Sequence, residues 1–258
     1  MAATQSEVDD MDATLAQFRT GVIKPVECIK EGWALIKDQY WLFLGISLVG
    51  ILIGGVVPIV LLGPMMVGIF LCLFQRMRNQ PVEFGLLFKG FDQFVPGLVV
   101  TVLKMIPVLI ILVPYYIFLI AMMATTMPRG GMEDPEQART FVMSLFGFEI
   151  VFFLVIMVVS LTVEIFFMFA YPLVADRKLS ALDAVKLSFR AGKANLGGVL
   201  GLMLLNMLFG MLGVLCCIIG VYFYLPIAFA SQAVAFRRVF PETSQPLPGP
   251  PPPPASWA

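Results

Sequence analysis

The chain contains no histidine, and only 13% of its 258 residues are charged. Histidine is the commonest general base and a frequent metal ligand, so its absence removes much acid–base and metal chemistry from consideration. The four cysteines, Cys28, Cys72, Cys216 and Cys217, form no C-x-x-C pair and have no other metal-binding spacing. We therefore expect reduced cysteines, no metal site and no cofactor.

An excess of positive charge is also missing, because 17 basic residues balance 17 acidic ones. Without a net basic field, nothing in the composition points to nucleic acid as a partner. The sequence contains no phosphate-binding loop and no motif that pairs a nucleophile with a base. These absences predict that the protein is not an enzyme.

Hydrophobic residues make up 59% of the chain and the mean hydropathy is +0.92, whereas soluble domains are about 45–50% apolar and about 25% charged. A membrane-spanning helix needs about 20 apolar residues. Such runs cover residues 41–75, 95–127, 146–175 and 195–236. The first and last runs are each nearly two spans long, and each has a glycine- or proline-containing break near its middle. The sequence thus predicts an all-α polytopic membrane bundle of six transmembrane helices.

The basic residues are distributed asymmetrically about these six spans. Only Arg129 and Arg139 fall on one side and Lys104 falls within a span, while the other fourteen lie on the opposite side. Cytoplasmic segments are enriched in Lys and Arg, which predicts that both termini are cytoplasmic. Residues 1–20 are polar and acidic, which argues against a cleaved signal peptide.

Composition divides the chain into three parts. These are a polar acidic segment over residues 1–20, a membrane domain over 21–240, and a proline-rich tail over 241–258. Proline supplies no backbone hydrogen-bond donor, so we expect the tail to be extended or disordered.

An amphipathic segment precedes each hydrophobic pair on the predicted cytoplasmic side, and we call these three the collar segments. Their apolar stripes have helical spacing and consist of Val26, Ile29, Trp33 and Ile36, then Phe84, Leu87, Phe88 and Phe91, then Leu182, Val185 and Phe189. The third also carries a basic edge, Lys186, Arg190 and Lys193, suited to anionic lipid headgroups. Such helices also serve as packing elbows, so the pattern leaves both roles open.

The chain shows signs of an internal threefold repeat in which each unit joins a collar segment to two spans. Pro64 is followed after ten and twelve residues by Phe74 and Arg76, and Pro226 is followed at the same offsets by Phe236 and Arg238. Ordinary alternation of polar and apolar segments in a polytopic chain is the alternative explanation.

Two charged residues, Lys104 and Glu164, fall inside predicted spans. Counted from Val95 and Asp176 at 1.5 Å per residue, they lie at depths of ~13 and ~18 Å, which are compatible with contact. A charge at membrane depth costs roughly 2.5 kcal/mol or more and needs a partner or a function. The pair is therefore a candidate intramembrane site, either polar glue between helices or part of an ion- or proton-linked pathway.

Three stretches, GPMMVG at 63–68, KGFDQF at 89–94 and ADRKLSALDAVKLSFRAGK at 175–193, are similar to a known family. Together they resemble uncharacterised six-helix bacterial inner-membrane proteins related to the membrane domain of some glycerophosphoryl diester phosphodiesterases. The resemblance covers roughly residues 22–240 and implies a helical bundle in the bacterial cytoplasmic membrane. It implies no activity, and no catalytic residue can be carried over.

Two functions remain in contention from the sequence. The first is a non-enzymatic structural or accessory membrane protein that binds lipid or a partner protein. The alternative is a small transporter or permease subunit with Glu164 near its pathway. The lipid bilayer is the expected partner, and the sequence leaves open a membrane protein partner and a homo-oligomer.

Overall fold

The computed structural model describes residues 18–126, 135–215 and 219–242. The acidic residues of the N-terminal segment and nearly all of the expected disordered tail lie outside this described part. Every regular element within it is helical, and six of its helices are long and apolar enough to cross a membrane. The prediction of an all-α membrane bundle with six transmembrane helices is confirmed.

The elements follow one another along the chain as a series of helices separated by short breaks. They are α2 (Pro25–Ile36), η1 (Lys37–Gln39), α3 (Tyr40–Val56), α4 (Pro58–Met77), η2 (Phe84–Gln93), α5 (Phe94–Thr126), α6 (Pro135–Phe167), α7 (Ala170–Arg177), α8 (Ala181–Ala194), α9 (Leu196–Leu215) and α10 (Ile219–Val239). The break between α3 and α4 falls at Val57, inside the predicted 53–58 interruption.

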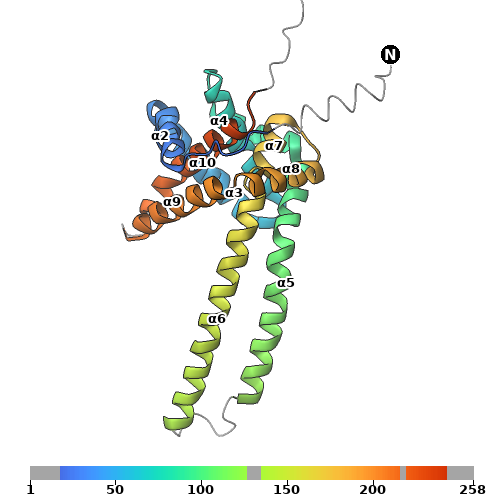
Figure 1. The fold of residues 1–258 in the computed structure, drawn as a ribbon, viewed down its shortest axis with the longest axis vertical. Coiled ribbons are helices and arrows are strands. Elements are labelled where there is room, and N and C mark those ends of the chain that lie inside the picture. Colours follow the sequence, from blue (N-terminus) through green and yellow to red (C-terminus); the bar gives the residue numbers. More distant parts are fainter. Residues whose placement is uncertain (1–17, 127–134, 216–218, 243–258) are drawn as a thin grey trace, which may run out of the picture.

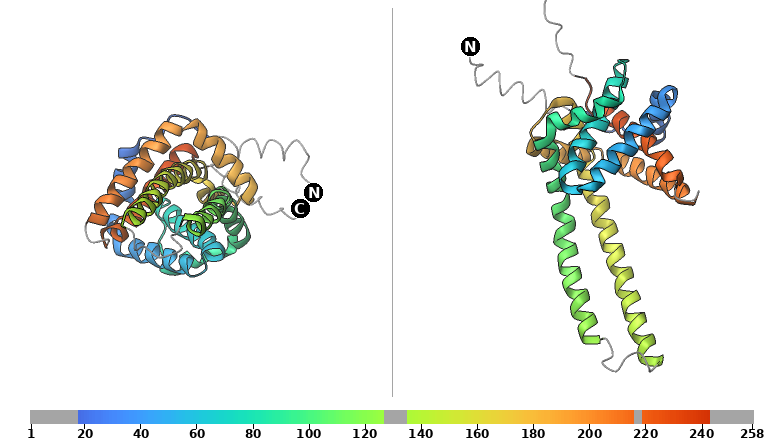
Figure 2. Two further views of the ribbon diagram at one scale, coloured as in Figure 1. Left: turned by 90° about the horizontal axis from the view of Figure 1, so that it is seen from below. Right: turned by 180° about the vertical axis from the view of Figure 1, so that it is seen from behind.

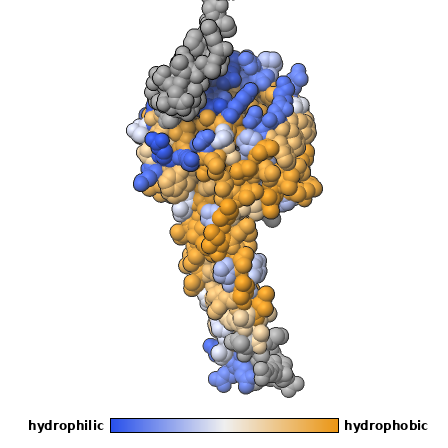
Figure 3. Space-filling view, turned by 90° about the vertical axis from the view of Figure 1, so that its right-hand side faces the viewer, coloured by the Kyte–Doolittle hydropathy of each residue, from blue (hydrophilic) through white to orange (hydrophobic). Residues whose placement is uncertain are grey.

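Helices α5 and α6 form a long hairpin that extends well beyond the remaining helices (Figures 1 and 2). Each has 33 residues, which corresponds to about 50 Å. The described side chains of α5 beyond Thr101 include no buried one, and none of those between 142 and 162 of α6 is buried. This surface is largely apolar, with a few polar residues such as Lys104 and Glu149 (Figure 3), so most of it is suited to contact with lipid hydrocarbon.

The remaining helices form a compact part whose core is aromatic. Five phenylalanines, each at most 2% exposed, gather where α4, α7 and α10 meet: Phe70, Phe74, Phe169, Phe236 and Phe240. The rings of Phe74 and Phe236, which the expected repeat placed at equivalent positions, are 5.2 Å apart. This aromatic part of the core therefore lies near the end of α10, far from the tip of the long hairpin (Figure 1).

Glycines allow α4 to approach η2 and α5 closely. A Cβ at Gly68 would overlap the carbonyl oxygen of Leu87, and one at Gly90 would overlap the carbonyl oxygen of Pro64. The second collar segment therefore lies directly against α4. It forms the ten-residue 3₁₀-helix η2 and not an α-helix. Gly85 and Gly90 weaken an α-helix here, although a 3₁₀-helix of this length is uncommon.

Helix α6 begins earlier than the apolar runs indicate. It starts at Pro135, whereas the apolar run begins only at residue 146. Proline is favoured in the first turn of a helix because its fixed φ is already helical, so Pro135 suits a helix start. Helix α5 remains one element with Pro107 and Pro114 inside it. The early start of α6 lengthens the hairpin.

Candidate functional sites

Lys104 and Glu164 are brought together at the base of the long hairpin. The Lys104 Nζ donates to both carboxylate oxygens of Glu164 at 2.7 Å. Beside them, the hydroxyls of Thr101 and Tyr171 lie 3.0 Å apart, and the Lys104 Nζ lies 5.9 Å from the centre of the Tyr171 ring. The ion pair thus joins α5 to α6 where the hairpin leaves the compact part.

The surroundings of this pair differ from a packed protein interior. The side chain of Lys104 is 27% exposed and that of Glu164 is 50% exposed. Further along the hairpin, the hydroxyl of Tyr115 donates to the carboxylate of Glu149. A close ion pair reduces the desolvation penalty that each charge suffers alone. The two contacts therefore hold the hairpin helices together, and the Lys104–Glu164 pair also partly neutralises its two charges.

Helix α8 presents three distinct faces. Its packed face consists of small or neutral residues, Ala181, Ala184, Leu187, Ser188, Ala191 and Gly192, all of them buried. The Ser188 hydroxyl donates to the carbonyl of Phe166 at 2.6 Å and accepts from the backbone N–H of Phe169 at 3.1 Å. A Cβ at Gly192 would lie 2.7 Å from the Ile165 carbonyl oxygen. Small residues therefore let α8 lie against the break between α6 and α7.

The other two faces of α8 point outward. Leu182 and Phe189 of the predicted apolar stripe are 56% and 47% exposed, and the predicted basic edge, Lys186, Arg190 and Lys193, is exposed beside them. An exposed apolar strip flanked by cations is the arrangement of a helix lying in a membrane interface. The sequence identified these residues, but it did not show that Leu182 and Phe189 are exposed while Val185, the third residue of the stripe, packs against the core.

Sequence reasoning missed an ion network at the polar face, and we call it the polar-face network. It consists of Arg78, Asp176, Arg237 and Glu242. The two terminal nitrogens of Arg237 contact the two oxygens of Asp176 at 2.6 and 2.8 Å, and Arg78 contacts Asp176 at 3.0 Å. The Asp176 side chain is only 8% exposed. Asp176 is 61 positions from Arg237 and 98 from Arg78, so no local pattern signals these contacts.

A groove of about 610 Å³ opens beside this network. Arg19, Arg237, Arg238, Glu31 and Glu242 provide its charged lining, and Ala34, Leu35, Met77 and Val234 provide its apolar lining. The Glu242 carboxylate bridges Arg78 and Arg237 at 3.0 and 3.3 Å. The Arg78 guanidinium, followed by the charge of Arg237, holds the pKa of Glu242 below its ordinary value.

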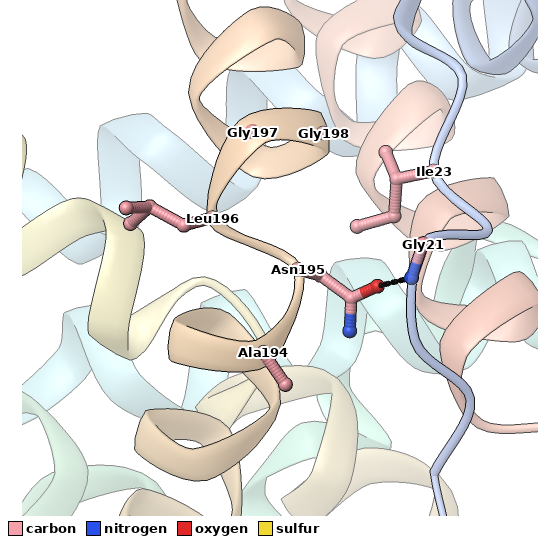
Figure 4. Close-up of a pocket in the computed structure, with 7 residues that line it drawn as sticks. All are labelled: Gly21, Ile23, Ala194, Asn195, Leu196, Gly197 and Gly198. Carbon is pink, nitrogen blue, oxygen red and sulfur yellow. Dashed lines mark hydrogen bonds between the residues drawn. The ribbon is translucent and has the colours of Figure 1, made fainter.

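A second cavity, of about 230 Å³, lies at the junction of α8 and α9 (Figure 4). Asn195 lines it and is only 4% exposed. Its amide oxygen accepts from the backbone N–H of Gly21, and its amide nitrogen donates to the carbonyls of Arg19 and Ala191. The bonds to Gly21 and Arg19 fasten the segment before α2 to the bundle, and the bond to Ala191 closes the end of α8, so Asn195 has a structural role.

Within the described ranges, no group of three or more cysteine or acidic residues is placed to hold a metal ion. No family model matches the chain, and no curated protein or solved structure matches it either.

Proposed function

We propose that the chain is a non-enzymatic structural or accessory membrane protein that binds anionic lipid through helix α8. Support comes from the three faces of α8. The small-residue face is buried against the rest of the protein, while Leu182 and Phe189 remain exposed beside Lys186, Arg190 and Lys193. Apolar side chains inserted beneath the headgroups would hold the three cations at the level of the lipid phosphates. The distribution of Lys and Arg supports placing this face and both termini at the cytoplasmic leaflet. The noted resemblance is compatible with a bacterial inner membrane.

This proposal predicts weaker retention of anionic lipid when Lys186, Arg190 and Lys193 are all changed to Gln. Each cation near an anionic surface contributes about 1 kcal/mol, so the apparent affinity should fall by up to about 100-fold. The measurement is the number of phosphatidylglycerol molecules that remain bound to the purified protein in native mass spectrometry, as a function of added lipid.

The matched control changes Lys30, Lys37 and Lys89 to Gln. These lysines are also exposed and lie in or beside the other two collar segments, so the change in net charge is identical. We expect the control to retain most of its lipid. An equal loss in both variants would show that collar charge in general, and not α8, attracts the lipid.

The second candidate, a transporter with an ion- or proton-linked Glu164, draws support from the 50% exposure of that side chain. The close contact with Lys104 opposes it, because both oxygens of the Glu164 carboxylate already have a partner on the neighbouring helix. We expect proteoliposomes with wild-type protein or Glu164→Gln to dissipate a pH gradient no faster than empty vesicles. Proton flux in the wild type that the substitution abolishes would establish the transporter instead.

A further inference from the structure

The groove beside the polar-face network contains the elements of an anion site. Arg237 of the groove lining and Arg78 next to it both contact one oxygen of Glu242. Arg19 and Arg238 also line the groove, and Arg238 is already paired with Glu27 and Glu31. The Nε of Arg237 is buried and has no hydrogen-bond partner in the described part of the chain. No carboxylate of the described residues lies within ion-pair distance of the Arg19 guanidinium. Arg19 thus retains donor capacity toward the groove, and Arg237 beside it is not fully hydrogen-bonded.

The Glu242 carboxylate stands where an external anion would bind. It follows the end of α10 by three residues, and its side chain is 52% exposed. Among the described residues, its contacts with the two arginines are the ones that hold it there. In contrast, Asp176 is 8% exposed and contacts Arg237 with both oxygens. Asp176 is therefore a fixed structural partner of Arg237, whereas Glu242 is the partner that can be displaced.

The size and lining of the groove indicate the class of ligand. Guanidinium groups bind phosphate oxygens in a bidentate manner, and a phosphate offers more acceptor oxygens than a carboxylate. A volume of about 610 Å³ is within the usual range for small-molecule sites. The apolar lining of Ala34, Leu35, Met77 and Val234 suits the organic portion of such a molecule.

We propose that this groove binds an organic phosphate, which takes the place of the Glu242 carboxylate between Arg78 and Arg237 and gains Arg19 as a further contact. The phosphate is either that of a small soluble phosphate ester or that of a phospholipid headgroup. Glu242 then acts as an internal competitor, so ligand binding and release of Glu242 from the arginines are coupled. This site is separate from the basic edge of α8 and does not rest on lipid binding there.

The test uses the full chain in phosphatidylcholine nanodiscs. In one arm glycerol 3-phosphate is titrated and binding is followed by calorimetry. In the other arm phosphatidylglycerol is mixed into the disc and retained lipid is counted by native mass spectrometry.

Glu242→Gln should bind the ligand about fivefold more tightly than wild type. An exposed carboxylate bridge contributes up to about 1 kcal/mol, so competition from Glu242 should weaken ligand binding by about that fivefold factor. Arg19→Gln and Arg78→Gln should each weaken binding severalfold, and both leave the buried Asp176–Arg237 pair intact.

Glu83→Gln and Lys89→Gln are the matched controls, since both residues are exposed and lie outside the groove. The site is supported if, in either arm, Glu242→Gln binds more tightly than wild type and the two arginine variants bind more weakly. The arm in which this is seen shows whether the phosphate belongs to a soluble molecule or to a lipid. The proposal is overturned if neither ligand binds wild type or Glu242→Gln. It is equally overturned if Arg19→Gln and Arg78→Gln leave the affinity unchanged or if the controls shift it as much.

Discussion

Replacement of Asp176 by alanine should lower the thermal midpoint of unfolding by about 6–20 °C. The substitution leaves the Arg237 guanidinium, whose side chain is 14% exposed, without its principal counter-charge. Breaking a buried pair by removing one partner costs about 3–5 kcal/mol, and each kcal/mol corresponds to roughly 2–4 °C for a domain of this size. Arg237 also lies 4.5 Å from the Phe74 ring centre, so its displacement disturbs the aromatic core.

The midpoint can be followed with a thiol-reactive dye in detergent, because Cys28 and Cys72 are buried and react when the fold opens. Asp38→Ala is the control. Asp38 is 65% exposed and contacts Arg76 at 3.3 Å, and exposed pairs contribute about 0–1 kcal/mol. We expect a shift of no more than about 4 °C for this variant.

A double variant tests whether the lost stability comes from the unpaired charge of Arg237. Asp176→Leu combined with Arg237→Met removes both charges and fills their volume with apolar atoms, which is often neutral or stabilising. Recovery of most of the lost stability would attribute the effect to an uncompensated charge. If the single variant behaves like Asp38→Ala, the network does not hold the polar face together.

The second large effect is expected for Gly68→Ala. The added Cβ would overlap the carbonyl oxygen of Leu87, which is backbone and cannot rotate away as a side chain can. Overpacking of this kind costs about 1–3 kcal/mol and occasionally more. Since η2 lies between α4 and α5, its displacement should also disturb the start of α5. We expect a lower unfolding midpoint and a lower yield of folded protein.

Gly210→Ala provides the matched control, because it makes the same chemical change inside another predicted span. A Cβ at Gly210 meets nothing within 4 Å, and alanine has a higher helix propensity than glycine by up to about 1 kcal/mol. This variant should be neutral or slightly more stable. Equal destabilisation of both variants would show that the contact between α4 and η2 is not the cause.

Much of the outline was predictable because the bilayer permits few alternatives. A long apolar run in lipid must satisfy its backbone groups internally, which it does as a helix. The interruption before Pro58 and the length of the last run therefore predicted two helical pairs. The start of α6 at Pro135 was missed because proline, glycine and acidic residues are typical both of loops and of first helical turns.

The candidate sites were predictable to a lesser degree. Depth along a helix showed that Lys104 and Glu164 were compatible with contact, because a helix has a fixed rise per residue. Helical spacing also predicted the apolar strip and basic edge of α8. In contrast, the groove needs side chains from the N-terminal segment, α2, α4 and α10, and nothing in local spacing relates those four elements.

The sequence by itself determined that this chain is an all-α membrane protein, because hydrophobicity and helical period are local properties. Only the tertiary structure decided which faces meet. It directed the small residues of α8 inward and its bulky strip outward, placed Gly68 against the backbone of η2, and joined Asp176 to Arg237 across 61 positions. Contacts between distant segments depend on how the helices pack. The helical period of the sequence shows which residues share a face, but it does not show which other helix that face contacts.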